Sequence, residues 1–310
     1  MAVVASTLSR LVDNIEKVIL GKREQVSLAV IGFLAGGHVL LEDVPGTGKT
    51  TLARALAMSL DLSFRRVQFT SDLLPSDVLG VSIFDAQQSV FRFKEGPIFG
   101  NVILADELNR TTPRTQSALL ECMNTSAISV DGETRNLPRP FHVIATQNPL
   151  EFEGTYPLPE SQLDRFLVRI RMGHPARDAE RRILMEQTGR NPLENLRPVM
   201  NAEEASAAIA RVTEVRVDPA LVDYVLDLTE ATRNGRQFLL GLSTRAAQAM
   251  YRAAQARALL AGRDYCVPDD IKSLAVPVFA HRVIPAPVGS GSDDPEELIR
   301  ALVESVEIPA

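Results

Sequence analysis

The pattern of apolar and polar positions divides the chain near residue 175. Before that point, short apolar runs alternate with stretches of helical periodicity. Apolar runs that are separated by helices are typical of a parallel sheet covered by helices on both faces. The sequence therefore predicts an α/β fold with five strands, over residues 38–42, 64–69, 102–106, 141–146 and 166–172.

The second half of the chain is rich in Ala, Leu, Arg and Glu and carries helix signals with few β-like runs. The pair Asp218-Pro219 predicts a helix start, because Asp caps a helix and Pro fits its first turn. The residues expected on the buried face of this helix are Leu221, Val222, Val225 and Leu226.

Terminal residues predict two more helices. Ser243 is a candidate N-cap for a helix that ends near Gly262. Pro268 opens another helix, with acidic residues next to it where the helix dipole favours them, and Pro277 should end or kink that helix. We therefore predict an α/β domain over residues 1–175 and a helical domain over residues 176–310.

Composition and charge narrow the class of protein. The 310 residues are 45% hydrophobic and 23% charged, which excludes disordered and fibrous classes. The net charge of −6 removes the simple electrostatic route to DNA or RNA, so no nucleic-acid partner is expected. The sequence shows no apolar stretch of about 18 residues and no secretory signal pattern, so we expect no membrane segment and a cytoplasmic location.

The cysteines and histidines do not form a recognisable metal motif. Cys122 and Cys266 are too few for a disulfide framework or a zinc site and are expected to be buried thiols. The histidines are scattered along the chain, at positions 38, 142, 174 and 281, and are expected in the core or on the surface.

The strongest chemical signal is a glycine-rich loop between a predicted strand and a predicted helix. Glycines let backbone N–H groups converge on a phosphate, and the helix that follows adds its positive end. Lys49 is expected to reach the β- and γ-phosphates of a nucleotide, and the Thr50 hydroxyl to bind Mg²⁺. Asp43 stands where a first glycine is usual, and its side chain is expected to turn away and bond loop backbone. The expected binding loop consists of Val44, Pro45, Gly46, Thr47, Gly48, Lys49, Thr50 and Thr51.

Polar side chains follow two of the predicted strands. Asp106 and Glu107 end the strand that begins at residue 102, and Asn148 follows the next predicted strand. Strand ends deliver side chains to the ligand crevice of an α/β sheet. Asp106 is a candidate Mg²⁺ ligand, Glu107 a candidate base for an attacking water, and Asn148 a candidate to orient that water.

Phosphoryl transfer spreads negative charge over the γ-phosphate, and an arginine can stabilise that charge. The candidate arginines are Arg110, Arg114, Arg165 and Arg245. The residues alone leave open which of these arginines reaches a γ-phosphate.

The motifs PGTGKT, ILADELNRTTPRTQSALLECM, VIATQNPLEFEGTYPLPESQLDRF and GLSTRA, in this order, resemble the MoxR group of AAA+ ATPases. The resemblance extends from about residue 18 to residue 281 and implies an αβα sandwich with a parallel five-stranded sheet and a C-terminal helical lid. It implies that Lys49 is the Walker A lysine, that Asp106 and Glu107 form Walker B, and that Asn148 is sensor 1. The lid reads GLST where GASP is usual, but it keeps the arginine.

The resemblance also implies where the remaining residues act. Arg165 matches the arginine finger, which acts on the next subunit, and Arg245 matches sensor 2, carried by the lid to the γ-phosphate across the interdomain crevice. Gly21 belongs to a segment that resembles the adenine-pocket lining. Residues 81–99 resemble an insert in helix 2, and residues 127–140, with an Asp-Gly turn, resemble a β-hairpin before sensor 1.

The function that the resemblance implies is ATP hydrolysis with Mg²⁺ in a homo-oligomeric ring, expected to be a hexamer. Such a motor is expected to remodel or mature a protein client, in complex assembly or metal insertion, together with a von Willebrand A domain protein. A DNA-acting motor, with Arg135 and Arg139 touching phosphate, remains an alternative. Two further alternative functions are a chelatase motor subunit and a nucleotide-gated binding module.

Overall fold

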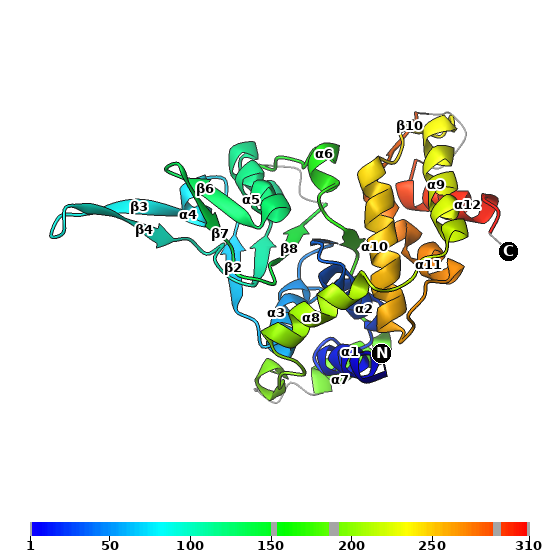
Figure 1. The fold of residues 1–310 in the computed structure, drawn as a ribbon, viewed down its shortest axis with the longest axis horizontal. Helices are drawn as coiled ribbons and strands as arrows, with labels where there is room; N and C mark the ends of the chain where they lie inside the picture. The colour runs from blue at the N-terminus through cyan, green and yellow to red at the C-terminus, as the bar shows by residue number, and fades with distance from the viewer. Residues whose placement is uncertain (1, 150–153, 186–191, 288–292, 309–310) are drawn as a thin grey trace.

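The computed structural model describes residues 2–149, 154–185, 192–287 and 293–308. Its first part alternates strands and helices (Figure 1). These elements are α1 (Ala2–Glu16), α2 (Arg23–Leu34), β1 (Val39–Glu42), α3 (Lys49–Ser59), β2 (Phe64–Gln68), α4 (Pro75–Leu79), β3 (Gly80–Asp85), β4 (Val90–Glu95), β5 (Val102–Asp106), η1 (Leu108–Arg110), α5 (Pro113–Thr125), β6 (Ala127–Val130), β7 (Glu133–Asn136), β8 (His142–Gln147), α6 (Glu160–Leu163) and β9 (Val168–Ile170).

The part of the chain after β9 is mainly helical. Its elements are α7 (Arg177–Met185), η2 (Pro192–Asn195), α8 (Ala202–Val212), α9 (Pro219–Asn234), β10 (Phe238–Leu240), α10 (Thr244–Leu260), α11 (Pro268–Phe279), η3 (Ala280–Arg282), β11 (Ile284–Pro285) and α12 (Pro295–Ser305). In Figure 1, helices α9 to α12 gather at one end of the molecule, opposite the β3–β4 hairpin. The domain boundary near residue 175 stays a prediction; it falls between β9 and α7.

All five predicted strands form one sheet in the order β2-β5-β8-β1-β9, and every neighbouring pair is parallel. The strands β1 and β5 are buried along their whole length. Alternate residues of β1 enter different cores: Val39 and Leu41 face the core that contains α1, α2 and α3, and Leu40 faces the core that contains α5. A sheet covered on both faces explains why its strands read as continuous apolar runs.

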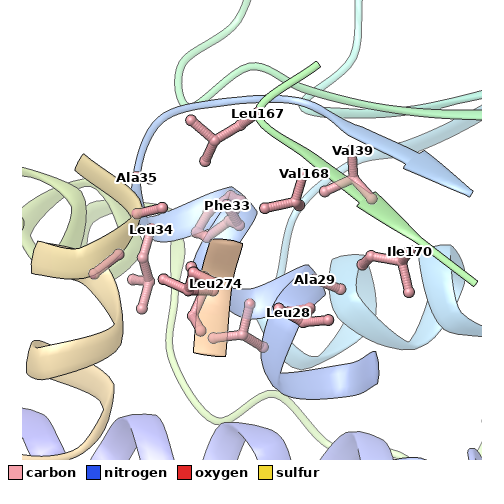
Figure 2. Packing of buried hydrophobic residues seen from close by; sticks show 14 of the residues in the cluster. Leu28, Ala29, Phe33, Leu34, Ala35, Val39, Leu167, Val168, Ile170 and Leu274 are labelled. Atoms are coloured by element: carbon pink, nitrogen blue, oxygen red, sulfur yellow. The ribbon is translucent and has the colours of Figure 1, made fainter. Parts of the chain in front are cut away.

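The helical part of the chain packs directly on the first helices. Helix α10 contacts α1 and α2, and α11 contacts β9. Figure 2 shows this junction, where Phe33 and Leu34 of α2 lie close to Val168 of β9 and Leu274 of α11. These residues are at most 1% exposed, and the apolar core is continuous from the sheet into the helical part.

The helix predictions are confirmed at most positions. Asp218 caps α9 and Ser243 caps α10, each by accepting a backbone N–H. The predicted buried position at Leu226 is wrong, since this side chain is 46% exposed. The buried face of α9 follows positions 221, 224, 225, 228, 229 and 232, and residue 226 lies off that stripe. Pro277 lies inside α11, which continues to Phe279.

Two β-hairpins stand out from the αβα body. The β6–β7 hairpin turns at Asp131 and Gly132, which have φ angles of 53° and 79°, as the Asp-Gly turn predicts. The insert at residues 81–99 forms the β3–β4 hairpin, which Figure 1 shows extending away from the body. The two hairpins touch where Ser82 donates to the carboxylate of Asp131 and where Arg135 lies over the Phe93 ring.

No helix in the described ranges is both long and apolar enough to cross a membrane. Cys122 and Cys266 are free and buried. The described residues hold no group of three or more His, Cys, Asp and Glu side chains suited to a metal ion.

Two of the histidines lie together in the core. His38 accepts the Val143 N–H at Nδ1, so its Nε2 carries the proton that it donates to the Met123 carbonyl, 2.8 Å away. His142 bonds the Gly37 carbonyl through Nδ1 at 2.7 Å. Burial lowers the pKa of His38 to about 4, and burial together with the neighbouring His38 lowers the pKa of His142 to about 3. Both side chains are therefore neutral in the folded protein at pH 7.

These two pKa values predict how stability depends on pH. Because the folded-state pKa lies below the unfolded value of about 6.5, the stabilisation is complete above that pH and is lost as the pH falls towards 4. We expect each histidine to lower the free energy of unfolding by about 1.4 kcal/mol per pH unit in this range. Urea unfolding at several pH values measures the slope. His142→Asn should reduce it by about that amount relative to the parent protein, and an unchanged slope would contradict the assignment.

Candidate functional site

The glycine-rich loop runs from the end of β1 to the start of α3, as the sequence predicts. Gly46 and Gly48 have φ angles of 86° and 90°, which L side chains rarely adopt. A Cβ at Gly46 would meet no atom within 4 Å, so this part of the loop faces open space. Gly48 caps α3, whose positive end therefore lies at the loop. The loop is thus shaped to present backbone N–H groups to an anion.

Two charged side chains fix the base of the loop. The Lys49 ammonium donates to the Asp43 carbonyl at 2.6 Å and to the Val44 carbonyl at 3.3 Å. The Asp43 carboxylate accepts the Val44 N–H at 2.7 Å and also the Gly173 N–H. The prediction that Asp43 bonds loop backbone is confirmed. Asp43 takes the place of the missing glycine by tying the loop to the segment after β9.

Asp106 and Glu107 lie at the carboxyl end of β5, next to the ends of β2 and β8. Asp106 is buried, and its carboxylate accepts two N–H donors of Arg66, at 3.0 and 2.7 Å, and the Thr146 hydroxyl at 2.6 Å. The same Thr146 hydroxyl accepts the Glu107 N–H at 2.8 Å. Strands β2 and β8 therefore both hold the carboxylate pair in place.

Glu107 has a left-handed backbone conformation, with φ 57° and ψ 48°. This conformation is costly for a residue with a Cβ, and such strain concentrates at functional sites. One oxygen of its carboxylate accepts Gln68 Nε2 at 2.6 Å and Arg110 Nη1 at 2.9 Å. Gln68 of β2 and Arg110 of the η1 turn therefore fix where this carboxylate points.

The loop and the carboxylates face one cavity of about 350 Å³, within the usual size of a ligand pocket. Lys49 and Glu107 share this cavity, as the sequence predicts. Its lining is drawn from the loop, the β5 end and the β8 end: Pro45, Gly46, Gly48, Lys49, Thr50, Thr51, Asp106, Glu107, Thr146 and Asn148.

Three predicted binding residues lie beside the cavity instead of in its wall. Val44 and Thr47 belong to the loop, where the Thr47 hydroxyl bonds the Val44 carbonyl at 3.2 Å. Gly21 follows α1 with a φ of 69°, and a Cβ on it would lie 3.1 Å from Ala179. Its neighbour Ile19 lies 3.9 Å from the position of a Cβ on Gly48. The 18–21 segment thus borders the loop.

Arg165 and Arg245 lie together at a second pocket, of about 240 Å³, whose lining shares no residue with the phosphate-loop cavity. Arg165 donates to the Leu120 carbonyl at 2.8 Å, and Arg245 donates to the Asn124 side chain at 2.5 Å. The expectation that the lid carries Arg245 to the phosphates of its own subunit is therefore not met in this structure. The physical reason is that α10 packs against α1 and α2, which keeps its first turn beside the end of α5.

The other candidate arginines occupy different places. Arg110 pairs with Glu107 of its own chain, and Arg114 is exposed in the first turn of α5. On the second hairpin, Arg135 pairs with Glu133 and lies 4.3 Å over the Phe93 ring. Of these three arginines, Arg110 is the one that forms an ion pair with a residue lining the phosphate-loop cavity, Glu107.

Sequence reasoning did not select Arg66 and Gln68, which contact the carboxylate pair from β2. Both are polar residues at the end of an edge strand, where polar side chains usually face solvent. Pairing β2 with β5 would have identified them, because Gln68 lies opposite Asp106 in the parallel register. Thr146 carries a similar signal at the end of β8.

The comparisons with known proteins agree with this geometry. The model of the ATPase family associated with various cellular activities (AAA) matches residues 38–168, and the AAA lid domain model matches residues 230–302. The uncharacterized protein YeaC of Bacillus subtilis is 47% identical over 97% of this chain and 95% of its own length. Chaperone MoxR1 of Mycobacterium tuberculosis is 36% identical over 100% of this chain and 84% of its own.

Another relative and a solved structure cover nearly all of the chain. Protein MoxR of Paracoccus denitrificans is 32% identical over 94% of both chains. The crystal structure of a candidate ATPase from Cytophaga hutchinsonii matches with a TM-score of 0.90 and 35% identity, covering 100% of this chain and 97% of that one. The chain therefore belongs to the MoxR family of AAA+ ATPases.

Proposed function

We propose that this protein hydrolyses ATP in the cavity between the glycine-rich loop and the ends of β5 and β8. The observation that carries the proposal is the shared cavity, which brings Lys49 together with Asp106, Glu107 and Asn148. A cation and backbone N–H groups on one side suit a triphosphate, and carboxylates on the other side suit the metal and the water that attacks it. In this proposal Gly21 and its segment border the adenine.

The donor set fits Mg²⁺. The Thr50 hydroxyl and the Asp106 carboxylate line the same cavity, and Mg²⁺ prefers oxygen ligands from one or two carboxylates together with substrate phosphates. When bound, the ion neutralises charge that develops on the β- and γ-phosphates. Arg66 occupies Oδ2 of the Asp106 carboxylate with two N–H donors and so holds its orientation. Oδ1 accepts the Thr146 hydroxyl and retains a lone pair for a further ligand.

We propose that Glu107 is the base that accepts a proton from the attacking water. Its carboxylate lies at the cavity wall, and Gln68 and Arg110 contact only one of its oxygens in the recorded bonds. Asn148, at the end of the neighbouring strand, would orient the same water through its side-chain amide. The strained backbone of Glu107 supports a functional role over a structural one.

We propose that Arg165 and Arg245 complete the ATP site of a neighbouring subunit. Both lie at a pocket separate from the phosphate-loop cavity of their own chain. Residues on one face that serve a site on another face require a head-to-tail interface, and such interfaces close into rings. A hexamer is the ring that the family resemblance implies. Arg110 instead pairs with its own Glu107, and Arg114 touches neither pocket, which favours Arg165 as the finger.

The proposed purpose of the motor is to remodel or mature a protein client, in complex assembly or metal insertion, with a von Willebrand A domain protein as partner. The support is the family, since one relative bears the name Chaperone MoxR1. A client could be trapped by a subunit that binds ATP and does not hydrolyse it. Affinity capture with Glu107→Gln in ATP tests this purpose, because capture of the same proteins in ADP would contradict it.

Replacing Glu107 by Gln tests the chemical assignment. The amide keeps the size of the side chain and cannot accept the proton, so we expect turnover to fall by about 10²–10⁴-fold. ATP affinity should stay within about twofold, because loop and lysine contacts remain. Phosphate release and nucleotide titration measure the two effects. Glu121→Gln, an exposed position on α5, is the matched control, and full turnover in Glu107→Gln would refute the assignment.

Replacing Arg165 by Ala tests action across subunits. We expect ATP binding to persist and turnover to fall by about 10³-fold or more. Mixing Arg165→Ala with Glu107→Gln should restore part of the activity, because the intact finger of one subunit then faces the intact site of the other. Arg114→Ala is the control for loss of an arginine elsewhere. Absence of any restoration would mean that Arg165 acts within its own subunit.

The ring requirement also predicts a dependence on concentration. Each site is incomplete without its neighbour, so turnover per subunit should rise with protein concentration until the ring is assembled. Steady-state phosphate release over a hundredfold dilution series, with sedimentation on the same samples, measures the two together. Constant turnover per subunit while the ring dissociates would contradict the shared site.

A further inference from the structure

Arg282 is an arginine buried in the junction between the sheet and the helical part, with its side chain 2% exposed. Its Nε donates to an Asp164 carboxylate oxygen at 2.8 Å. Its Nη1 donates to the Leu167 carbonyl at 3.2 Å and to the Val278 carbonyl. Its Nη2 donates to the Asp164 carbonyl at 3.3 Å and to the Phe166 carbonyl at 2.7 Å. Every nitrogen of the guanidinium is therefore engaged.

These bonds converge on the short segment that carries Arg165. Arg282 holds the backbone carbonyls on both sides of that residue and the carboxylate directly before it. The neighbouring His281 adds a bond from Nε2 to the Phe166 carbonyl, at 2.9 Å. A planar guanidinium with five fixed donors suits such a cluster of acceptors, and an ammonium with three donors does not. The helical part thus fixes the backbone at Arg165.

The Asp164 carboxylate also reaches the helix that carries Arg245. Its second oxygen accepts the Ser243 hydroxyl at 3.3 Å, and this same hydroxyl caps α10. Arg245 lies in the first turn of that helix, so its position depends on where the turn is held. The ion pair of Asp164 and Arg282 therefore lies between the two arginines and contacts the backbone or the cap that supports each of them.

The electrostatics of this pair agree with a fixed charged cluster. Burial lowers the pKa of Arg282 to about 10, and the Asp164 carboxylate opposes that shift. The guanidinium is therefore charged at neutral pH. A buried ion pair is by itself weak support for stability, because hydrophobic replacements are often as stable. A role in holding the neighbouring groups at fixed positions explains why two charged side chains occupy this junction.

We propose that Asp164 and Arg282 are positioning residues for Arg165 and Arg245, which hold both guanidinium groups at the spacing that the neighbouring subunit's ATP requires. The proposal rests on the proposed function, since it presupposes that these arginines act across the subunit interface. It goes beyond that function because it gives a positioning role to two residues that lie outside the phosphate-loop cavity and are not the arginine finger. A displacement of about 1 Å in such a group lowers turnover by about a hundredfold.

Asp164→Asn is the sharpest variant, because the amide keeps the shape of the side chain and removes its charge. We expect kcat to fall by about ten- to a hundredfold, with the KM for ATP within about twofold, since the subunit's own loop and lysine are untouched. Arg282→Lys, which keeps the charge and loses the planar donors, should give the same pattern. Circular dichroism, thermal unfolding and sedimentation verify that each variant folds and assembles.

Asp270→Asn is the matched control. Asp270 is buried and pairs with the partly buried Arg263, at 2.8 and 2.6 Å. It also accepts the Val267 N–H at the start of α11, away from the Arg165 segment. A general loss of stability would affect both variants alike, whereas loss of positioning should affect Asp164→Asn alone. The control should therefore keep kcat, even where its thermal midpoint falls as far as that of Asp164→Asn.

Mixed rings separate positioning from a structural defect. Asp164→Asn subunits have an intact ATP site, so a Glu107→Gln neighbour with an intact finger should raise their turnover above the weighted mean of the two variants alone. Unchanged kcat in Asp164→Asn and Arg282→Lys, while Arg165→Ala loses turnover, would overturn this inference and leave the proposed function standing. A loss that mixing does not restore would also overturn it. Full turnover in Arg165→Ala would overturn the proposed action of Arg165 on the neighbouring subunit and leave the proposed ATP hydrolysis standing.

Discussion

The parallel pairing of β1, β5 and β8 is the constraint on which the site depends. In a parallel sheet all carboxyl ends meet at one edge, so the loop after β1, the acids after β5 and the amide after β8 lie together even though they are far apart in sequence. The register fixes the match, since Leu40 lies opposite Ala145, and Ala145 opposite Ala105. A slip of one residue would turn Asp106 or Thr146 to the other face of the sheet.

The same edge explains how two carboxylates can be held next to each other. Arg66 and Gln68 of β2 and Thr146 of β8 supply hydrogen bonds to Asp106 and Glu107. Charged groups that are already bonded and oriented need little rearrangement when a substrate arrives, which is the condition for electrostatic catalysis. The second pocket lies apart from this edge, and its two arginines bond the Leu120 carbonyl and the Asn124 side chain of α5.

Much of this arrangement was readable in the sequence because it is local or set by strand ends. The five strands, the loop at Lys49, the acids of β5, the Asp-Gly hairpin and the caps at Asp218 and Ser243 each carry a short-range signal. The placement of Arg245 was not readable, since it depends on how α10 packs against α1 and α2. The prediction for Leu226 was wrong because four apolar residues within six positions do not reveal which stripe of the helix is buried.

The central claim is that Lys49 and Glu107 act on a single triphosphate. A structure of the assembled protein with a non-hydrolysable ATP analogue and Mg²⁺ tests it most directly. The account predicts the γ-phosphate between the Lys49 ammonium and the Glu107 carboxylate of one subunit, with Arg165 approaching from the next. A nucleotide seated elsewhere, or in contact with Lys49 and remote from Glu107, would contradict it.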